Sequence, residues 1–173
     1  MPLTSPIRPY DPGWPQQYAD EEARLRPVFG LALLAIHHVG STAVPDLVAK
    51  GEIDVLAVIN SAGSVEQWTS PLEKLGYRRG GDLSVGHHFF KRDLAGIRTH
   101  KLHICRESHA QIARMLRFRD HLRRHPADRM RYQELKLGLE RQNTGGIQEY
   151  LTAKAPFIDA MLASLDADPK SDV

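Results

Sequence analysis

The sequence predicts an α+β fold, in which a mixed β-sheet core flanked by helices is followed by a C-terminal helical part. Up to residue 107, short runs rich in β-branched and apolar residues recur between glycines and prolines, as strands do. From Ser108 onward the apolar residues recur at helical spacing instead. A length of 173 residues fits a single domain over 1–173, with a sheet core over about 1–107, a helical part over about 108–165 and a frayed tail over 166–173.

The first helix follows a turn-rich arm over residues 7–15. Tyr10 and Trp14 are expected to anchor this arm on the core through their aromatic rings. Pro15 suits the first turn of a helix, which we expect to continue to about Phe29.

Two strands and a sharp turn come next. The apolar residues of 33–39 are consistent with a buried strand, and the β-branched run from Ile53 to Ile59 predicts a second one. Gly40 lies where the chain must turn sharply or approach a ligand closely, because a residue without Cβ permits either. Pro45 ends any regular structure after this turn.

The rest of the sheet is predicted from a helix and a hairpin. A helix is expected over 61–75, with Gly76 as its C-terminal stop. The segment 77–82 is interpreted as strand or loop, and 84–92 and 96–106 as two further strands. The sheet should therefore have at least four strands.

The last predicted strand, 96–106, alternates in character and is expected to follow a hairpin turn at 93–96. Because neighbouring residues of a strand point to opposite faces, Lys101, His103 and Cys105 should share one face. The apolar residues between them, and His100, should lie on the other.

The helical part divides into three expected helices, over about 109–124, 127–141 and 147–165. Pro126 separates the first two, because it breaks one helix and can start the next. A turn over 144–146 precedes the third.

Composition indicates an ordinary globular protein. Charged residues make up 25% of the chain and the net charge is +2, so nucleic acid is not indicated as a partner. The single cysteine, Cys105, excludes an intrachain disulfide and fits a reducing compartment. No run approaches the ~18 apolar residues of a membrane span, and the N-terminus lacks a signal pattern, so a cytoplasmic location without membrane contact is expected. The oligomeric state is left open.

The turn and the second strand together suggest a phosphate and metal site. Gly40, Ser41 and Thr42 offer backbone N–H groups and hydroxyls to an anion. Glu52 and Asp54 share a strand face, where two carboxylates repel each other unless a cation neutralises them. Mg²⁺ is the usual cation where the substrate carries phosphates. The alternative is that Glu52 only marks the solvent-exposed start of a strand.

Several ordered blocks stand out along nearly the whole chain. They are Tyr10-Asp11-Pro12-x-Trp14-Pro15, His38-Val39-Gly40-Ser41-Thr42-Ala43-Val44-Pro45, Ala49-Lys50, Ile53-Asp54, Leu75-Gly76-Tyr77, Leu102-His103-Ile104, Phe118-Arg119-Asp120-x-Leu122-Arg123-x-His125-Pro126, Tyr132-x-x-Leu135-Lys136 and Tyr150-x-x-x-Lys154-x-x-Phe157-Ile158. With these blocks in this order, the chain resembles the GrpB-like family. The resemblance implies a core of the nucleotidyltransferase superfamily with a C-terminal helical part. It does not imply a settled reaction.

The sequence departs from the family pattern at the acids. The family usually has Glu in place of His37, Gly in place of Asp46 and Pro-Ile in place of Gly51-Glu52. Asp54 is commonly its lone acid on this strand, so Glu52 is either a second metal ligand or an accident at the strand start.

The third acid of the superfamily, a general base on a later strand, is also absent from the matching position. Here the matching strand offers His103, which could act as base or bind metal, or be a packed histidine.

Basic side chains in the matching blocks are candidate phosphate ligands. Lys50, Arg119, Lys136 and Lys154 could form a cationic pocket for a triphosphate or another anion, or could lie on solvated helix faces. His88 could meet a phosphate or lie on an exposed edge.

The leading hypothesis is a metal-dependent transferase that moves a nucleotidyl group from a nucleoside triphosphate to an unknown acceptor. Asp54, with Glu52, would hold Mg²⁺, and His103 would take the acceptor's proton. Two alternatives remain open: a catalytically impaired nucleotide- or anion-binding module, and a protein-interaction domain with a vestigial pocket.

Overall fold

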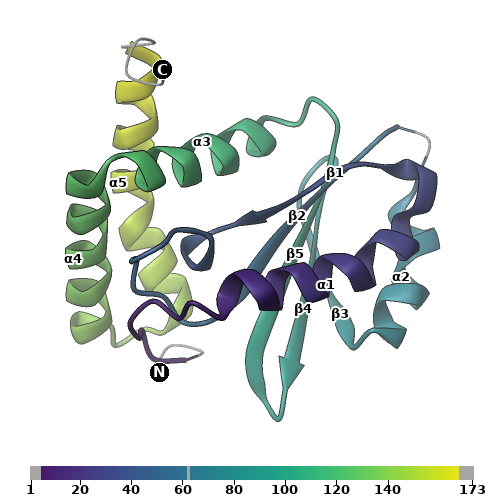
Figure 1. The fold of residues 1–173 in the computed structure, drawn as a ribbon, viewed down its shortest axis with the longest axis horizontal. Helices are drawn as coiled ribbons and strands as arrows, with labels where there is room; N and C mark the ends of the chain where they lie inside the picture. Colours follow the sequence, from purple (N-terminus) through teal and green to yellow (C-terminus); the bar gives the residue numbers. More distant parts are fainter. Residues whose placement is uncertain (1–4, 62, 168–173) are drawn as a thin grey trace.

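A computed structural model describes residues 5–61 and 63–167 of the chain. The elements follow one another as α1 (Trp14–Phe29), η1 (Gly30–Ala32), β1 (Leu33–Val39), η2 (Ser41–Ala43), β2 (Ile53–Ile59), α2 (Val65–Lys74), β3 (Tyr77–Ser84), β4 (His87–Leu94), β5 (Ile97–Arg106), α3 (Ala110–Arg124), α4 (Pro126–Gln142) and α5 (Ile147–Ala167). The predicted α+β fold, with helices after the sheet, is confirmed (Figure 1).

The described strands form one mixed sheet in the order β1-β2-β5-β4-β3. β2 and β5 pair in parallel, and the other neighbouring strands are antiparallel. The parallel pair sets Asp54 opposite Lys101, and the β1–β2 pair sets Val39 opposite Asp54. The segment that the sequence left as strand or loop is β3, so the sheet has five strands.

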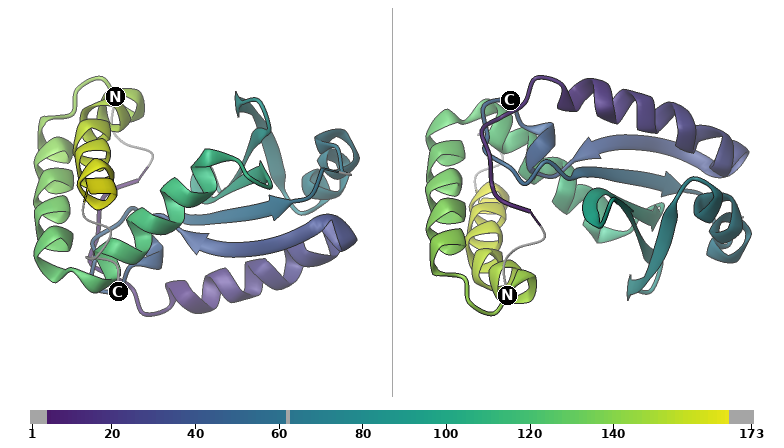
Figure 2. Two further views of the ribbon diagram at one scale, coloured as in Figure 1. Left: turned by 90° about the horizontal axis from the view of Figure 1, so that it is seen from above. Right: turned by 90° about the horizontal axis from the view of Figure 1, so that it is seen from below.

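One face of the sheet is covered by α1 and α2, and this layer holds the largest core cluster. Trp14, Phe29 and Trp68 are buried in it against apolar residues of β2 and β5. Tyr10 contacts the Trp14 ring edge-on, with 5.3 Å between ring centroids, so the predicted anchoring of the arm is confirmed. Figure 2 shows α1 along this face and α3 on the other side of the sheet.

The helical part covers the end of the sheet and part of its second face. Met115 and other side chains of α3 contact buried residues of β1, β2 and β5. A separate cluster joins α3, α4 and α5 to Val44 and Leu47 of the loop after β1. This arrangement places all three helices beside the Gly40 turn (Figure 1).

Boundaries differ from the expected ones where turns are tighter than predicted. Residues Ala95 and Gly96, both with positive φ, form the hairpin turn, so β4 continues to Leu94. Helix α5 reaches Ala167, which makes the first two residues of the expected frayed tail helical; 168–173 lie outside the described residues. Among the described residues, no helix is long and apolar enough to cross a bilayer.

Candidate functional site

The turn after β1 lies directly against the acidic strand. Gly40 has φ 71° and ψ −171°, a conformation that is strained for any residue with a Cβ. A Cβ at Gly40 would lie 2.2 Å from Oδ2 of Asp54, which is closer than a real contact allows. The serine-bearing turn and the carboxylate of β2 therefore meet, and glycine is what permits the approach.

Buried hydrogen bonds of Thr42 hold this turn on the start of β2. The Thr42 hydroxyl donates to the carbonyl of Glu52 at 3.2 Å and lies 3.0 Å from Nε2 of His38. Thr42 is buried, and its hydroxyl is already engaged on both sides. The sequence assigned Thr42 to phosphate, whereas the structure gives its side chain a role in positioning the turn.

Two arginines of α3 donate hydrogen bonds to backbone carbonyls on either side of Gly40. Nη1 of Arg119 donates to the carbonyl of His38 at 2.9 Å, and Nε of Arg123 donates to the carbonyl of Ala43 at 2.8 Å. Arg119 also lines the larger cavity described below. Its guanidinium holds the end of β1 and is also paired with Asp120, with Nε 2.7 Å from Oδ1.

Lys101 forms ion pairs with both predicted metal ligands. Its ammonium is paired with Glu52 and lies 3.7 Å from Oδ1 of Asp54, while Lys50 lies 3.4 Å from Oε1 of Glu52. Burial alone would lower the pKa of Lys101, but the Asp54 and Glu52 carboxylates outweigh it and raise that pKa, so this ammonium stays charged. Burial raises the pKa of the Asp54 carboxyl, and Lys101 opposes that rise.

This arrangement does not fit a two-carboxylate magnesium site. The parallel register puts Lys101 beside Asp54, so a cationic side chain bridges the two carboxylates that would hold the ion. A divalent cation would have to displace that ammonium and would be repelled by it. The negative charges of Glu52 and Asp54 are therefore balanced by Lys101 of the same chain, whether or not solvent reaches the two carboxylates.

Lys136 reaches the turn from α4. Its ammonium donates to Oγ of Ser41 at 3.1 Å and to the carbonyl of Val48, and it lies 4.9 Å from the centre of the Tyr132 ring. Burial, and then the nearby Lys154 and Lys50, lower the pKa of Lys136 to about 7.

Lys154 of α5 lies on the same side of the site. Burial, followed by the charge of Lys101, lowers its pKa to about 8. The ammonium lies 5.3 Å from the centre of the Tyr150 ring. Both of these lysines can therefore gain or lose a proton near neutral pH.

Two adjoining cavities share this site. The larger, of about 420 Å³, lies between the sheet and the C-terminal helices, and the smaller, of about 50 Å³, shares part of its lining. Both are lined by Ser41, Asp54, Lys101 and Lys154. The predicted site residues that line one or both are Gly40, Ser41, Thr42, Lys50, Glu52, Asp54, His103, Arg119, Lys136 and Lys154. Residues from separate elements thus converge on one hollow.

His103 lines the larger cavity but is poorly suited to be a general base. Its Nδ1 lies 2.9 Å from Nε2 of His87. Burial, then the neighbouring His87 and Lys101, lower the pKa of His103 to about 3. A base works best with a pKa near the working pH, so this imidazole binds a proton too weakly at neutral pH.

His88 does not reach the cavities. It pairs in register with Ile104, whose side chain lies in the core on the α1 face of the sheet, so His88 points to that same side. There its Nδ1 lies 2.7 Å from Oδ1 of Asp82. The phosphate role expected for His88 is therefore corrected, because the alternation of β4 turns this ring away from Asp54.

Lys101 is the residue of the candidate site that sequence reasoning missed. The alternation of the segment placed Lys101 and His103 on one face, but only the pairing of β2 with β5 shows that Lys101 is the one opposite Asp54. The aromatic lining was missed too, because Phe89, Phe118 and Tyr132 come from three different elements.

Comparison with known proteins gives a family. The family model described as "GrpB protein" matches residues 5–164. The chain belongs to the GrpB family. A curated relative, "UPF0157 protein YqkA" of Bacillus subtilis (strain 168), is 35% identical over 150 residues, which are 86% of this chain and 43% of that protein. This chain thus spans less than half the length of that GrpB relative.

Solved structures agree with the fold of this GrpB chain. The crystal structure of GrpB from Enterococcus faecalis is 31% identical, with a TM-score of 0.82 over 90% of this chain and 93% of that one. The Cid1 poly(U) polymerase, solved with Mg 3′-dATP bound, gives a TM-score of 0.58 at 11% identity over 85% of this chain and 49% of that one. At that identity the likeness shows a nucleotidyltransferase-like fold alone.

Proposed function

We propose that this protein binds a nucleoside triphosphate, or a closely similar polyphosphate ligand, through lysine ammonium groups in place of a metal ion. The observation that carries the proposal is Lys101, which bridges Glu52 and Asp54 where the fold would otherwise need a cation. The protein is then the nucleotide-binding module, without dependence on magnesium, that the sequence left as an alternative.

The charges around the smaller cavity favour a polyanion. Four lysines line it (Lys50, Lys101, Lys136 and Lys154), against two carboxylates, Glu52 and Asp54. Fully protonated, the lysines leave a positive excess inside a partly buried hollow, where charge interactions are stronger than in water. Ser41 belongs to the turn, accepts a hydrogen bond from Lys136 and lines the smaller cavity. Its backbone N–H and hydroxyl would therefore lie near a bound phosphate.

The larger cavity has the volume and the lining to hold the nucleoside part of the ligand. Its volume of about 420 Å³ is within the range of small-molecule sites. Phe89, Phe118 and Tyr132 line it, and aromatic faces of this kind stack on a planar base. Because both cavities share Asp54, Lys101 and Lys154, a base in the larger one leaves phosphates beside the lysines.

Thermal unfolding with ATP, GTP, CTP and UTP, each in Mg²⁺ or in EDTA, tests the proposal. We expect at least one nucleotide to raise the melting temperature equally in both conditions, because the ligand binds only the folded state and lysines supply the charge. No shift with any nucleotide would overturn the proposal.

A pair of lysine variants checks the location. Lys154→Met should weaken nucleotide binding by about tenfold, because one charge-assisted contact is lost. Lys74→Met, at the exposed end of α2, is the matched control and should bind as the wild type does. Equal affinities of the two variants in calorimetric titration would place the ligand elsewhere.

Metal-dependent nucleotidyl transfer is the second candidate, favoured by the contact between Asp54 and the Gly40 turn. It requires that nucleotide binding depend on Mg²⁺ and that pyrophosphate be released with an acceptor. Lys101→Ala separates the two functions, because it removes the bridging ammonium. We expect Mg²⁺ to stabilise Lys101→Ala and to leave the wild type unchanged; Mg²⁺-dependent stabilisation of the wild type would favour transfer.

A further inference from the structure

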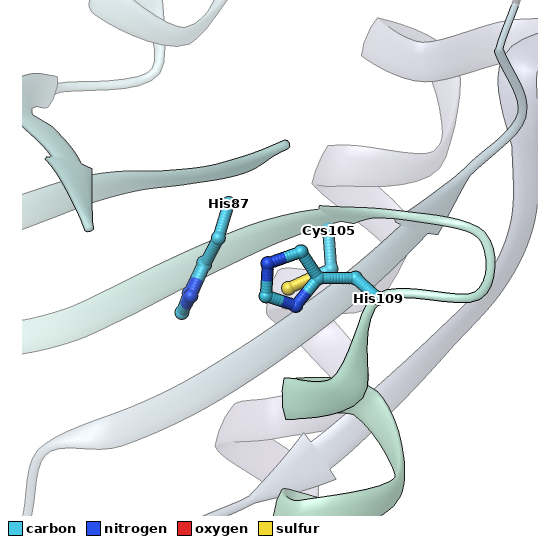
Figure 3. A group of neighbouring side chains, drawn as sticks. All are labelled: His87, Cys105 and His109. Carbon is cyan, nitrogen blue, oxygen red and sulfur yellow. The ribbon is translucent and has the colours of Figure 1, made fainter. Parts of the chain in front are cut away.

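A second cluster of ligating side chains lies on the same sheet face, away from the acid pair. His87 at the start of β4 is in register with Cys105 of β5, so both side chains point to the face that α3 covers. His109 is the N-cap residue of α3, three residues after the end of β5. One ligand atom from each lies within 4.8 Å of the other two. Figure 3 shows the His109 ring against the Cys105 sulfur, with the His87 ring across from it.

The two histidines use their Nε2 atoms for side-chain hydrogen bonds, so a metal would bind Nδ1 of each, and Nδ1 of His109 must first release the backbone N–H of Gln111. Nε2 of His87 lies 2.9 Å from Nδ1 of His103, and Nε2 of His109 lies 3.0 Å from Oγ of Ser84. A metal-bound imidazole commonly donates its other N–H to such an acceptor, which fixes the ring and its tautomer. His103 and Ser84 are placed to accept those protons, and each Nδ1 is then left as the donor atom.

We propose that His87, Cys105 and His109 bind Zn²⁺, with a fourth position for water or an external ligand. Two imidazoles and a thiolate form a donor set that suits tetrahedral zinc. Around such an ion the donor atoms lie about 3.3–3.8 Å apart, from bond lengths of about 2.0–2.3 Å. Since no two donor atoms are more than 4.8 Å apart, the cluster needs to close by at most about 1–1.5 Å, and the partly exposed His109 ring is the ligand with most room to rotate.

Zinc binding at this place has two local consequences. The thiol of Cys105 loses its proton on binding, since the thiolate is the ligand. Nδ1 of His109 also gives up the hydrogen bond that it now accepts from the backbone N–H of Gln111 at 3.1 Å, so the first turn of α3 loses this side-chain cap when zinc binds. The site lies beside the nucleotide cavity, because His103 both lines that cavity and contacts His87. It does not depend on the lysines of the proposed function.

Cobalt substitution tests the site without reference to activity. Co²⁺ added to the metal-free chain should give a thiolate-to-cobalt charge-transfer band and tetrahedral d–d absorption, saturating at one ion per chain. Zn²⁺ should abolish both bands and raise the melting temperature of the wild type, since it binds the folded state. Absence of the charge-transfer band would overturn the proposal, because the single cysteine is required for it.

Variants separate the site from adventitious binding. His109→Gln is expected to fold, because its side chain is only partly buried, and should lower zinc affinity at least 100-fold. Cys105→Ser should remove the charge-transfer band while circular dichroism shows an intact fold. His88→Gln is the matched control, since it neighbours His87 but points to the opposite face, and it should bind as the wild type does. Stoichiometric binding that survives His109→Gln and Cys105→Ser would show an adventitious ion only.

Discussion

Gly40 and Lys101 are the single residues that decide the chemistry of the acidic strand. The first lets the turn touch Asp54, and the second neutralises the carboxylates that this contact would otherwise offer to a metal. A shared fold does not by itself fix the chemistry of a site, because one ammonium at one strand position changes the charge beside the two carboxylates.

Gly40→Ala should destabilise the protein by about 3 kcal/mol or more. The positive φ costs about 1–3 kcal/mol for a residue with Cβ, and the new methyl group overlaps the Asp54 carboxylate. Urea unfolding measures the loss. Gly96→Ala is the control, because its φ is 79° but a Cβ there meets nothing within 4 Å, so only the smaller backbone cost applies. Equal losses in both variants would refute the close contact with Asp54.

Nucleotide affinity should fall as the pH rises above 7. The pKa of Lys136 in the free protein is about 7 and that of Lys154 about 8, so each loses its charge over this range. A bound polyanion favours the ammonium forms, so binding takes up protons and affinity falls by up to tenfold per pH unit for each proton taken up.

Calorimetric titration from pH 6.5 to 9, in buffers of different ionisation enthalpy, measures this uptake. Lys136→Met should bind more weakly and take up fewer protons at pH 7.5; subtracting its profile removes the titration of the nucleotide itself. A pH-independent affinity in the wild type would show that these lysines do not contact the phosphates.

Between elements, a buried carboxylate joins α1 to the sheet. Glu21 accepts from the Tyr77 hydroxyl at 2.9 Å and is paired with Arg92 of β4 at 2.9 Å and with Arg24 at 3.0 Å. Glu21 is 2% exposed, so these partners provide the hydrogen bonds that water would make to a carboxylate at the surface. His100, on the α1 face as expected, hydrogen-bonds to Arg92 within this network.

Glu21→Ala should cost about 3 kcal/mol of the free energy of unfolding, because it leaves the mostly buried Arg92 without its carboxylate. Glu22→Ala is the matched control on the same helix; its ion pair with Arg26 is partly exposed and should contribute under about 1 kcal/mol. Chemical denaturation of both variants gives the comparison. A loss for Glu21→Ala no larger than for Glu22→Ala would show that the network does not hold α1 in place.

Across the whole molecule, the sheet core and the helical part should unfold as one unit. Both tryptophans, Trp14 and Trp68, lie in the cluster between the sheet and α1 and α2, whereas α3, α4 and α5 share their apolar contacts with β1, β2, β5 and the turn. Tryptophan fluorescence therefore reports the sheet core, and far-ultraviolet circular dichroism reports mainly the helices. We expect coincident thermal transitions and equal shifts with bound nucleotide. Two separate midpoints would show two domains.

The sequence by itself determined the elements and the turn. Strand and helix follow from the local period of apolar residues, and Gly40 followed from the residues on either side of it. The segment 77–82 was left open as strand or loop because its residues are mostly exposed and carry little apolar alternation.

Tertiary structure alone decided which side chains meet. The register of β2 against β5 put Lys101, and not His103, opposite Asp54, and the alternation of β4 sent His88 away while it brought His87 to Cys105. The register between strands that are distant along the chain depends on how all the elements pack into one core. It cannot be predicted from the residues of either strand alone. A shift of one residue would have exchanged every one of these side chains between the two faces.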